Sequence, residues 1–96
     1  MIIVLGEATA AGSTLDELIA ASLAHVRRSR TEPGCLSHDV ARDPENPNRL
    51  LFTERWADRA DLERHFEVPA SREFVATVRR CCGDQFAIAT YATGDD

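Results

Sequence analysis

The chain has 96 residues, of which 44% are apolar, and this size and composition indicate one globular domain. Its formal charge of −5, from 16 acidic and 11 basic side chains, disfavours nucleic-acid binding, which requires a basic surface. No apolar run approaches the roughly 20 residues of a membrane span. Three cysteines, two of them adjacent, do not form a disulfide framework, so we expect a cytoplasmic protein. The charge and the short apolar runs lead us to expect no nucleic-acid or membrane partner.

The beginning of the chain predicts a strand followed by a helix. Residues 1–9 are rich in isoleucine and valine and alternate between the two faces of a strand. Residues 13–17 contain a capping-box pattern in two alternative registers, S-x-x-D and T-x-x-E, which opens a helix. We expect that helix to end near Arg30.

A hairpin is predicted between residues 35 and 56. Pro33 and Gly34 break the preceding helix, because proline restricts the residue before it and glycine adopts dihedrals closed to other residues. Residues 35–42 and 49–56 both alternate in polarity, and the short connection between them indicates antiparallel pairing. We place residues 43–48 in the turn, since their two prolines cannot sit in a central strand.

Two helical stretches follow the hairpin. Asp58 can cap a short helix that runs through Phe66. A second stretch begins at Pro69, because proline suits the first position of a helix, and it ends at Gly83, a typical C-terminal stop.

The order of elements predicts the fold class. Residues 84–92 form a last strand and 93–96 a polar tail, so that a single domain covers 1–96. The order strand, helix, strand, strand, helix, strand is that of the ferredoxin-like α+β fold, βαββαβ, with helices on one face of a four-stranded antiparallel sheet. Nothing covers the other face, so we expect a homodimer in which a second subunit does.

One strand of the hairpin carries a carboxylate on an apolar face. Glu54 alternates in register with Leu50, Phe52 and Trp56, and therefore points toward the interior or its rim. An ionised carboxylate buried alone is costly, so Glu54 needs a partner or a shifted pKa. Two readings stay open: a salt bridge to an arginine at the subunit interface, or a polar group at a ligand cavity.

Two histidines follow a similar logic. His38 lies between Leu36 and Val40 on a predicted strand face, and His65 lies beside Phe66 on the short helix. Each can be a satisfied core histidine, but the two can also converge with Trp56 on one cavity. Imidazole is the side chain best suited to move a proton near neutral pH. The histidine pair beside a tryptophan favours the cavity.

The other candidate ligands give no recognised cofactor site. His25, on the shoulder of the first helix, is interpreted as a surface or interface residue. No pair of histidine, cysteine or carboxylate residues has zinc or iron spacing, and there is no phosphate-binding glycine loop or dinucleotide fingerprint. Cys35, Cys81 and Cys82 are expected to pack in the core. We therefore assign no metal ligands and expect no cofactor.

Together these residues suggest a family. The segment EPGCLSHDVARDPENPNRLLFTERWADRADLERHFEVPASREF contains a Glu-Pro-Gly-Cys turn, an Asp-Pro hairpin and the Glu54-x-Trp56 pair. After these come a capped helix carrying His65, a proline, and an aromatic residue, Phe74. This combination resembles the antibiotic biosynthesis monooxygenase domain over about half the chain, and the flanking elements fit the remainder.

The resemblance implies a dimer in which two sheets join into an α/β-barrel. It also implies oxidation of a small aromatic, quinol or anthrone with O₂ and without metal or flavin, because the deprotonated substrate itself donates an electron to oxygen. Such a reaction needs a dry apolar pocket and a group that transfers a proton. The catalytic role falls to His65 first and His38 second. Six further residues are expected to contact the substrate: Trp56, Glu54, Phe52, Leu62, Phe66 and Phe74.

Two other functions are known or conceivable for such a fold. A haem-degrading branch of the family uses an asparagine on the first strand, a tryptophan on the short helix and a later histidine, and this sequence matches none of them. A non-catalytic small-molecule-binding or stress-response dimer stays open as the alternative. The catalytic interpretation predicts that His65, Trp56 and His38 line one enclosed pocket, whereas the binder is favoured if they are packed solid.

Overall fold

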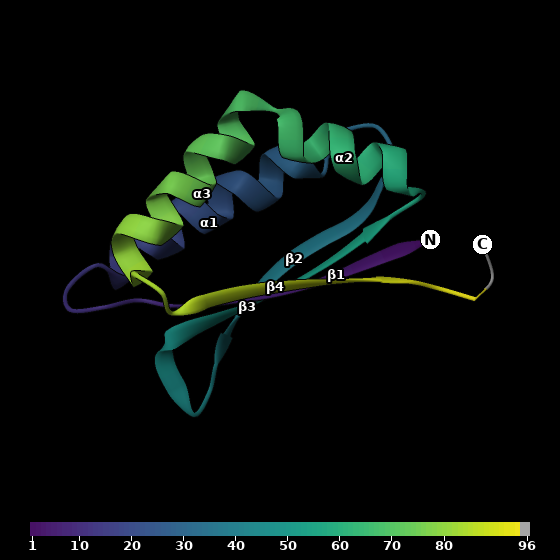
Figure 1. Cartoon of the computed structure of the whole chain (residues 1–96). Helices are drawn as coiled ribbons and strands as arrows, with labels where there is room; N and C mark the ends of the chain where they lie inside the picture. The colour runs from purple at the N-terminus through teal and green to yellow at the C-terminus, as the bar shows by residue number, and fades with distance from the viewer. Residues whose placement is uncertain (95–96) are drawn as a thin grey trace.

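The computed structural model describes residues 1–94 and has a four-stranded antiparallel sheet with three helices against one face (Figure 1). The strands lie in the order β2-β3-β1-β4. The elements in chain order are β1 Ile2–Thr9, α1 Leu15–Ser29, β2 Cys35–Asp43, β3 Asn46–Trp56, α2 Arg59–Glu67, α3 Pro69–Cys82 and β4 Phe86–Ala92. The predicted α+β architecture is confirmed, and part of the predicted tail, residues 95–96, lies outside the described residues. Within 1–94, no helix is long and apolar enough to cross a membrane.

The helix boundaries follow from their capping residues, with one exception. Asp58 accepts a hydrogen bond from the backbone N–H of Asp61 at the start of α2, as predicted. Gly83 ends α3 with a φ of 63°, a conformation that favours glycine. The predicted capping box of α1 does not form, because the hydroxyl of Thr14 donates instead to the carbonyls of Ala11 and Cys81. Thr14 thus ties the start of α1 to the end of α3.

The strand β3 begins earlier than predicted and contains Pro47, which the sequence placed in a turn. The pairing of β1 with β3 ends at Thr9 and Arg49, so among the described residues β3 has only β2 beside it at this point. The missing N–H of Pro47 can therefore face away from β2, as prolines on sheet edges do. Figure 1 shows the tip of the β2–β3 hairpin projecting beyond the sheet.

The buried face of β2 also differs from the simple alternation predicted. The pairing with β3 shifts between Cys35 and Ser37, which is the signature of a β-bulge. As a result Leu36 is 59% exposed, whereas His38 is completely buried. The expectation that Leu36 shares an inward face with His38 is therefore wrong, because the bulge resets the alternation between them.

The core beneath the helices has two apolar parts separated by polar side chains. One part includes Leu50 and Phe52 of β3, and the other includes Trp56 together with Leu62 of α2. Glu54 lies between them on the same buried strand face, and it is only 6% exposed. The polar region that interrupts the core is the candidate site described below.

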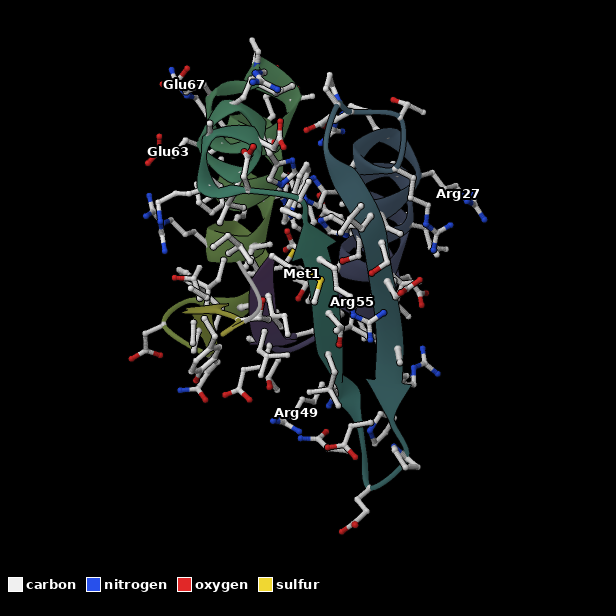
Figure 2. All side chains as sticks on the ribbon, turned by 90° about the vertical axis from the view of Figure 1, so that its right-hand side faces the viewer. Met1, Arg27, Arg49, Arg55, Glu63 and Glu67 are labelled. Carbon is white, nitrogen blue, oxygen red and sulfur yellow. The ribbon has the colours of Figure 1, made fainter. Side chains whose placement is uncertain are left out.

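The helix α2 separates inward and outward side chains clearly. Glu63 and Glu67 point away from the sheet (Figure 2), whereas Leu62 and His65 are buried against it. Within residues 1–94, no helix covers the opposite face of the sheet (Figure 1), where Leu5 of β1 is 46% exposed.

We expect Gly34→Ala to lower the free energy of unfolding by about 3 kcal/mol. Gly34 has a φ of +80°, and an added Cβ would lie 2.1 Å from Cγ of Asp61, so both backbone strain and overlap oppose alanine. Gly12→Ala is the matched control: its φ is +59°, but nothing lies within 4 Å of the added Cβ, and we expect a loss of about 1 kcal/mol. Urea unfolding of both variants checks this, and equal losses would contradict it.

Candidate functional site

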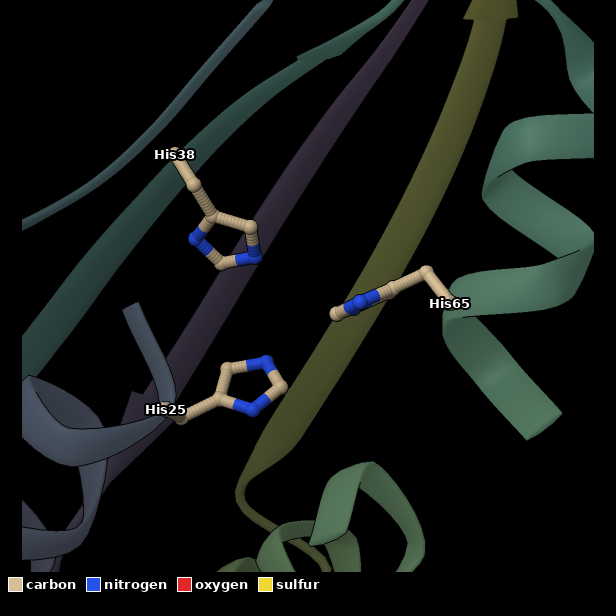
Figure 3. Close-up of side chains that lie close together, drawn as sticks. All are labelled: His25, His38 and His65. Carbon is tan, nitrogen blue, oxygen red and sulfur yellow. The ribbon is translucent and has the colours of Figure 1, made fainter. Parts of the chain in front are cut away.

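Three histidines from three different elements meet beneath the helices. His25 comes from α1, His38 from β2 and His65 from α2, and their rings turn toward one common space (Figure 3). All three are buried, with exposed fractions of 5%, 0% and 3%. One ring nitrogen of each lies within 4.8 Å of the others. The fold thus concentrates all the imidazoles of the chain in one place.

Glu54 lies beside this cluster and is held by Trp56. The indole Nε1–H of Trp56 donates to Oε1 of Glu54 at 2.9 Å. The same oxygen lies 3.2 Å from Nε2 of His38 and 4.0 Å from Nε2 of His65. Burial raises the pKa of Glu54, but the imidazole of His38 and the indole N–H outweigh burial, so the pKa lies below its ordinary value. Glu54 is therefore a buried carboxylate with partners inside the chain.

His65 is positioned by a second carboxylate. Nδ1 of His65 lies 2.8 Å from Oε1 of Glu32, and its ring lies against Trp56 with the centroids 4.6 Å apart. An ionised carboxylate only accepts hydrogen bonds, so Nδ1 carries the proton in the neutral imidazole. Nε2 is then left with a free lone pair, which is the form that can accept a proton.

His25 is buried rather than at the surface, which corrects the sequence-based expectation. Its ring stacks on Phe74 of α3, with centroids 4.1 Å apart and an interplanar angle of 9°. Nδ1 lies 2.6 Å from Nη2 of Arg28, one turn later on α1. Burial, with the neighbouring His38, His65 and Arg28, lowers the pKa of His25 to about 3. This imidazole is therefore neutral near pH 7.

A pocket of about 460 Å³ opens between the sheet and α3, next to the histidines. Its volume is in the range of small-molecule sites. Five of the predicted site residues line it: His65, Glu54, Phe52, Phe66 and Phe74. Arg72 and Arg79 of α3 also line the pocket.

The other predicted site residues do not line this pocket. Trp56 and His38 are completely buried, and Leu62 is 1% exposed. Trp56 and His38 contact the pocket-lining Glu54 from behind, as supports of the wall. The structure therefore brings His38, His65 and Trp56 together, but only His65 of the three reaches the pocket.

Two residues of the site were missed by sequence reasoning. Glu32 belongs to the Glu-Pro-Gly turn, yet nothing in the pattern reveals that this turn reaches His65 on α2. Nothing in the sequence of α1 indicates the burial of His25, because that burial comes from Phe74 on another helix. The one indication in the sequence is that Glu32 is an acidic residue directly before the Pro-Gly turn, and this does not identify its partner.

Comparison with solved structures supports the fold assignment. A Deinococcus radiodurans protein provisionally named an antibiotic biosynthesis monooxygenase has a TM-score of 0.92 and 24% identity, covering 100% of this chain and 95% of that one. A Pseudomonas aeruginosa protein has a TM-score of 0.86 and 26% identity over 96% and 92% of the two chains. A Mycobacterium tuberculosis protein has a TM-score of 0.89 and 23% identity over 99% and 96%. The ferredoxin-like fold predicted from the sequence is confirmed.

Comparison of sequences gives the family. The profile described as antibiotic biosynthesis monooxygenase matches residues 1–77. The chain belongs to this family, as the resemblance of its hairpin and short helix predicted. An uncharacterized protein of Synechocystis is 39% identical over 74 residues, which are 77% of this chain and 50% of that protein. The chain therefore spans half the length of this curated relative.

Proposed function

We propose that the protein is a cofactor-independent monooxygenase that oxidises a small aromatic, quinol or anthrone with O₂. The observation that carries the proposal is the geometry of His65, whose Nδ1 lies 2.8 Å from Oε1 of Glu32 while its ring lines the pocket. A base of fixed tautomer at the wall of an apolar pocket is what deprotonation of such a substrate needs. Phe52, Phe66 and Phe74 supply aromatic contacts for a flat substrate.

The proposed reaction begins with proton transfer from the substrate to Nε2 of His65. The resulting carbanion or phenolate donates an electron to O₂, and the two radicals combine into a peroxide on the substrate carbon. Loss of water from the peroxide, with the proton returned by His65, leaves a new carbonyl group. For an anthrone, C₁₄H₁₀O + O₂ gives C₁₄H₈O₂ + H₂O, so the methylene carbon supplies all four electrons and no external reductant is needed. Glu32 stabilises the imidazolium between the two proton transfers.

Oxygen uptake by metal-stripped protein tests this proposal. The panel contains anthrones, naphthohydroquinones and simple quinols, each measured with chelator present. We expect uptake above the protein-free rate for at least one of them. Absence of uptake with every one of these substrates, under conditions where binding to the pocket is saturated, would contradict the proposal.

Glu32→Gln is expected to lower kcat about 10- to 100-fold with little change in KM, because it removes the charge that fixes and stabilises His65. Glu63→Gln is the matched control, since Glu63 points away from the sheet on the outer side of α2. Steady-state oxygen uptake of both variants is the measurement. Equal activity of the two variants would show that the carboxylate beside His65 has no part in turnover.

The alternative is a non-catalytic small-molecule-binding dimer. It is favoured by one observation, the complete burial of Trp56 and His38 behind the pocket wall. The two candidates differ in the oxygen-uptake experiment. A non-catalytic binder takes the ligand into the pocket but consumes no oxygen.

We also propose that the protein acts as a homodimer in the cytoplasm. The three free cysteines suit a reducing compartment. The face of the sheet away from the helices carries the exposed Leu5 and Tyr91, which a second copy would bury. A dimer formed through this face also relieves the thin core of a domain of this size.

Leu5→Lys is therefore expected to convert a dimer into a monomer. Leu5 is already 46% exposed in the single chain, so the lysine disturbs association and not the core. Glu63→Lys places the same side chain on the outer side of α2 and should leave the dimer intact. Size-exclusion chromatography with light scattering measures the mass, and a monomeric wild-type protein would contradict the proposal.

A further inference from the structure

The three histidines and Glu54 have the composition of a metal-ligand set. One nitrogen of each of His25, His38 and His65 lies within 4.8 Å of the others, and Oε1 of Glu54 adjoins two of the rings. Figure 3 shows the rings facing one another across a single space. Imidazole and carboxylate groups are ligands for borderline divalent ions such as Zn²⁺ and Co²⁺.

His38 is the strongest indication that the cluster is more than packing. It is completely buried, and within residues 1–94 neither of its ring nitrogens has a partner in hydrogen-bond geometry. Its Nε2 is 3.2 Å from Oε1 of Glu54, but the contact lacks the alignment of a hydrogen bond. Buried polar side chains are almost always paired, so this one points to a group that the protein alone does not supply.

The surroundings of His65 and Glu54 match the outer shell of metal sites. Glu32 accepts from Nδ1 of His65 and so leaves Nε2 as the donor atom toward the cluster. Carboxylates that hold the far nitrogen in this way orient metal-ligating histidines. The indole Nε1–H of Trp56 donates to Oε1 of Glu54 and so fixes the position of that carboxylate.

Arg28 opposes metal binding at His25. A guanidinium only donates hydrogen bonds, so its 2.6 Å contact makes Nδ1 of His25 an acceptor and places the proton of the neutral ring on Nε2. For Nε2 to bind an ion, the proton must move to Nδ1 and Arg28 must turn away. Arg28 is only half-buried, so its side chain has room to do so.

We propose that His25, His38, His65 and Glu54 bind one divalent transition-metal ion of the Zn²⁺ and Co²⁺ class. Four protein ligands suit tetrahedral coordination, in which donor atoms at 2.0–2.1 Å from the metal lie about 3.4 Å apart. Side-chain rotation must therefore bring the ligand atoms closer together than the separations of up to 4.8 Å that they have in the structure. The inference goes beyond the proposed monooxygenase activity, which uses His65 without a metal. An ion bound at Nε2 of His65 would block that base, so metal binding should inhibit oxygen uptake.

Co²⁺ titration of tag-free, metal-stripped protein tests the site. We expect one Co²⁺ per chain with the strong visible d–d bands of four-coordinate cobalt, displaced by Zn²⁺. His38→Phe should weaken binding about 100-fold or more, while Arg28→Gln should strengthen it about tenfold. Cys35→Ser is the control for thiolate binding and should change nothing. Binding that survives in His38→Phe, or that shows sulfur charge-transfer bands, would overturn the proposal.

A second readout keeps the test decisive if His38→Phe does not fold. Zn²⁺ should shift the ring nitrogen resonances of all three histidines of the wild-type protein, and saturation without those shifts would exclude the site. No binding to wild-type or Arg28→Gln at millimolar Co²⁺ would also exclude it. Oxygen uptake is measured with chelator present, so failure of the monooxygenase proposal and failure of the metal site are seen in separate experiments.

Discussion

His65→Asn is expected to lower kcat/KM for oxygen uptake about 100- to 10,000-fold, the usual contribution of a general base. The asparagine amide can still donate to Glu32, as Nδ1 of His65 does at 2.8 Å, so the local fold is kept. What is lost is Nε2, the nitrogen that accepts the proton in the proposed reaction. Initial rates with metal-stripped protein, measured with an oxygen electrode, give the ratio.

Two controls separate catalysis from structure in this experiment. His65→Ala leaves a cavity beside the pocket, and added imidazole should restore part of its activity if the missing group is a base. Unfolding curves of His65→Asn should stay within about 1 kcal/mol of wild type, since a donor to the carboxylate remains. A variant with activity within threefold of wild type would remove His65 from the mechanism.

Trp56→Ala is expected to lower the free energy of unfolding by about 4 kcal/mol. Trp56 is completely buried and packs with Ile2, Val4 and Leu62 in the second part of the core. Its removal also leaves the buried Glu54 without its indole hydrogen bond. Urea unfolding followed by circular dichroism measures the loss without depending on the single tryptophan of the chain.

Trp56→Phe isolates the polar part of this loss. Phenylalanine keeps an aromatic ring in the site but removes the N–H that reaches Oε1 of Glu54, so we expect a loss of about 1–3 kcal/mol. In the double variant with Glu54→Leu, the polar part of the loss should largely disappear, because no unpaired carboxylate remains. Trp56→Phe should therefore cost less stability in the Glu54→Leu background than in the wild-type background. An equal loss in both backgrounds would contradict this role of the indole.

The sequence predicted those features that depend on neighbouring residues alone, namely the buried face of β3 and two helix boundaries. Alternation placed Phe52, Glu54 and Trp56 on one buried face of β3, and all three are there. Asp58 and Gly83 marked helix boundaries because their roles depend on nearby backbone alone. Local chemistry of this kind needs no knowledge of distant contacts.

What the sequence could not predict depends on contacts between distant segments. The bulge in β2 exposes Leu36, and no residue pattern predicts the position at which the pairing of β2 with β3 shifts register. Glu32 and His65 meet only because the turn before β2 lies against α2. His25 is buried because α3 brings Phe74 onto its ring.

The polar cluster is costly for so small a protein, which is an argument for its function. Glu54 and three imidazoles interrupt a core that could have been filled with apolar side chains at less cost in desolvation. Perturbed, buried ionisable groups next to a pocket are typical of functional sites. The proposed metal site uses all four of these side chains, and the proposed monooxygenase activity uses His65.

Cofactor-independent monooxygenase activity is tested most directly by ¹⁸O₂ labelling of the product that metal-stripped protein forms from its best substrate. A cofactor-independent monooxygenase should place one ¹⁸O atom in each product molecule, at full rate with chelator present and about 100-fold or more slowly in His65→Asn. Product without label, or turnover that stops on chelation and returns with a metal ion, would contradict a cofactor-independent monooxygenase.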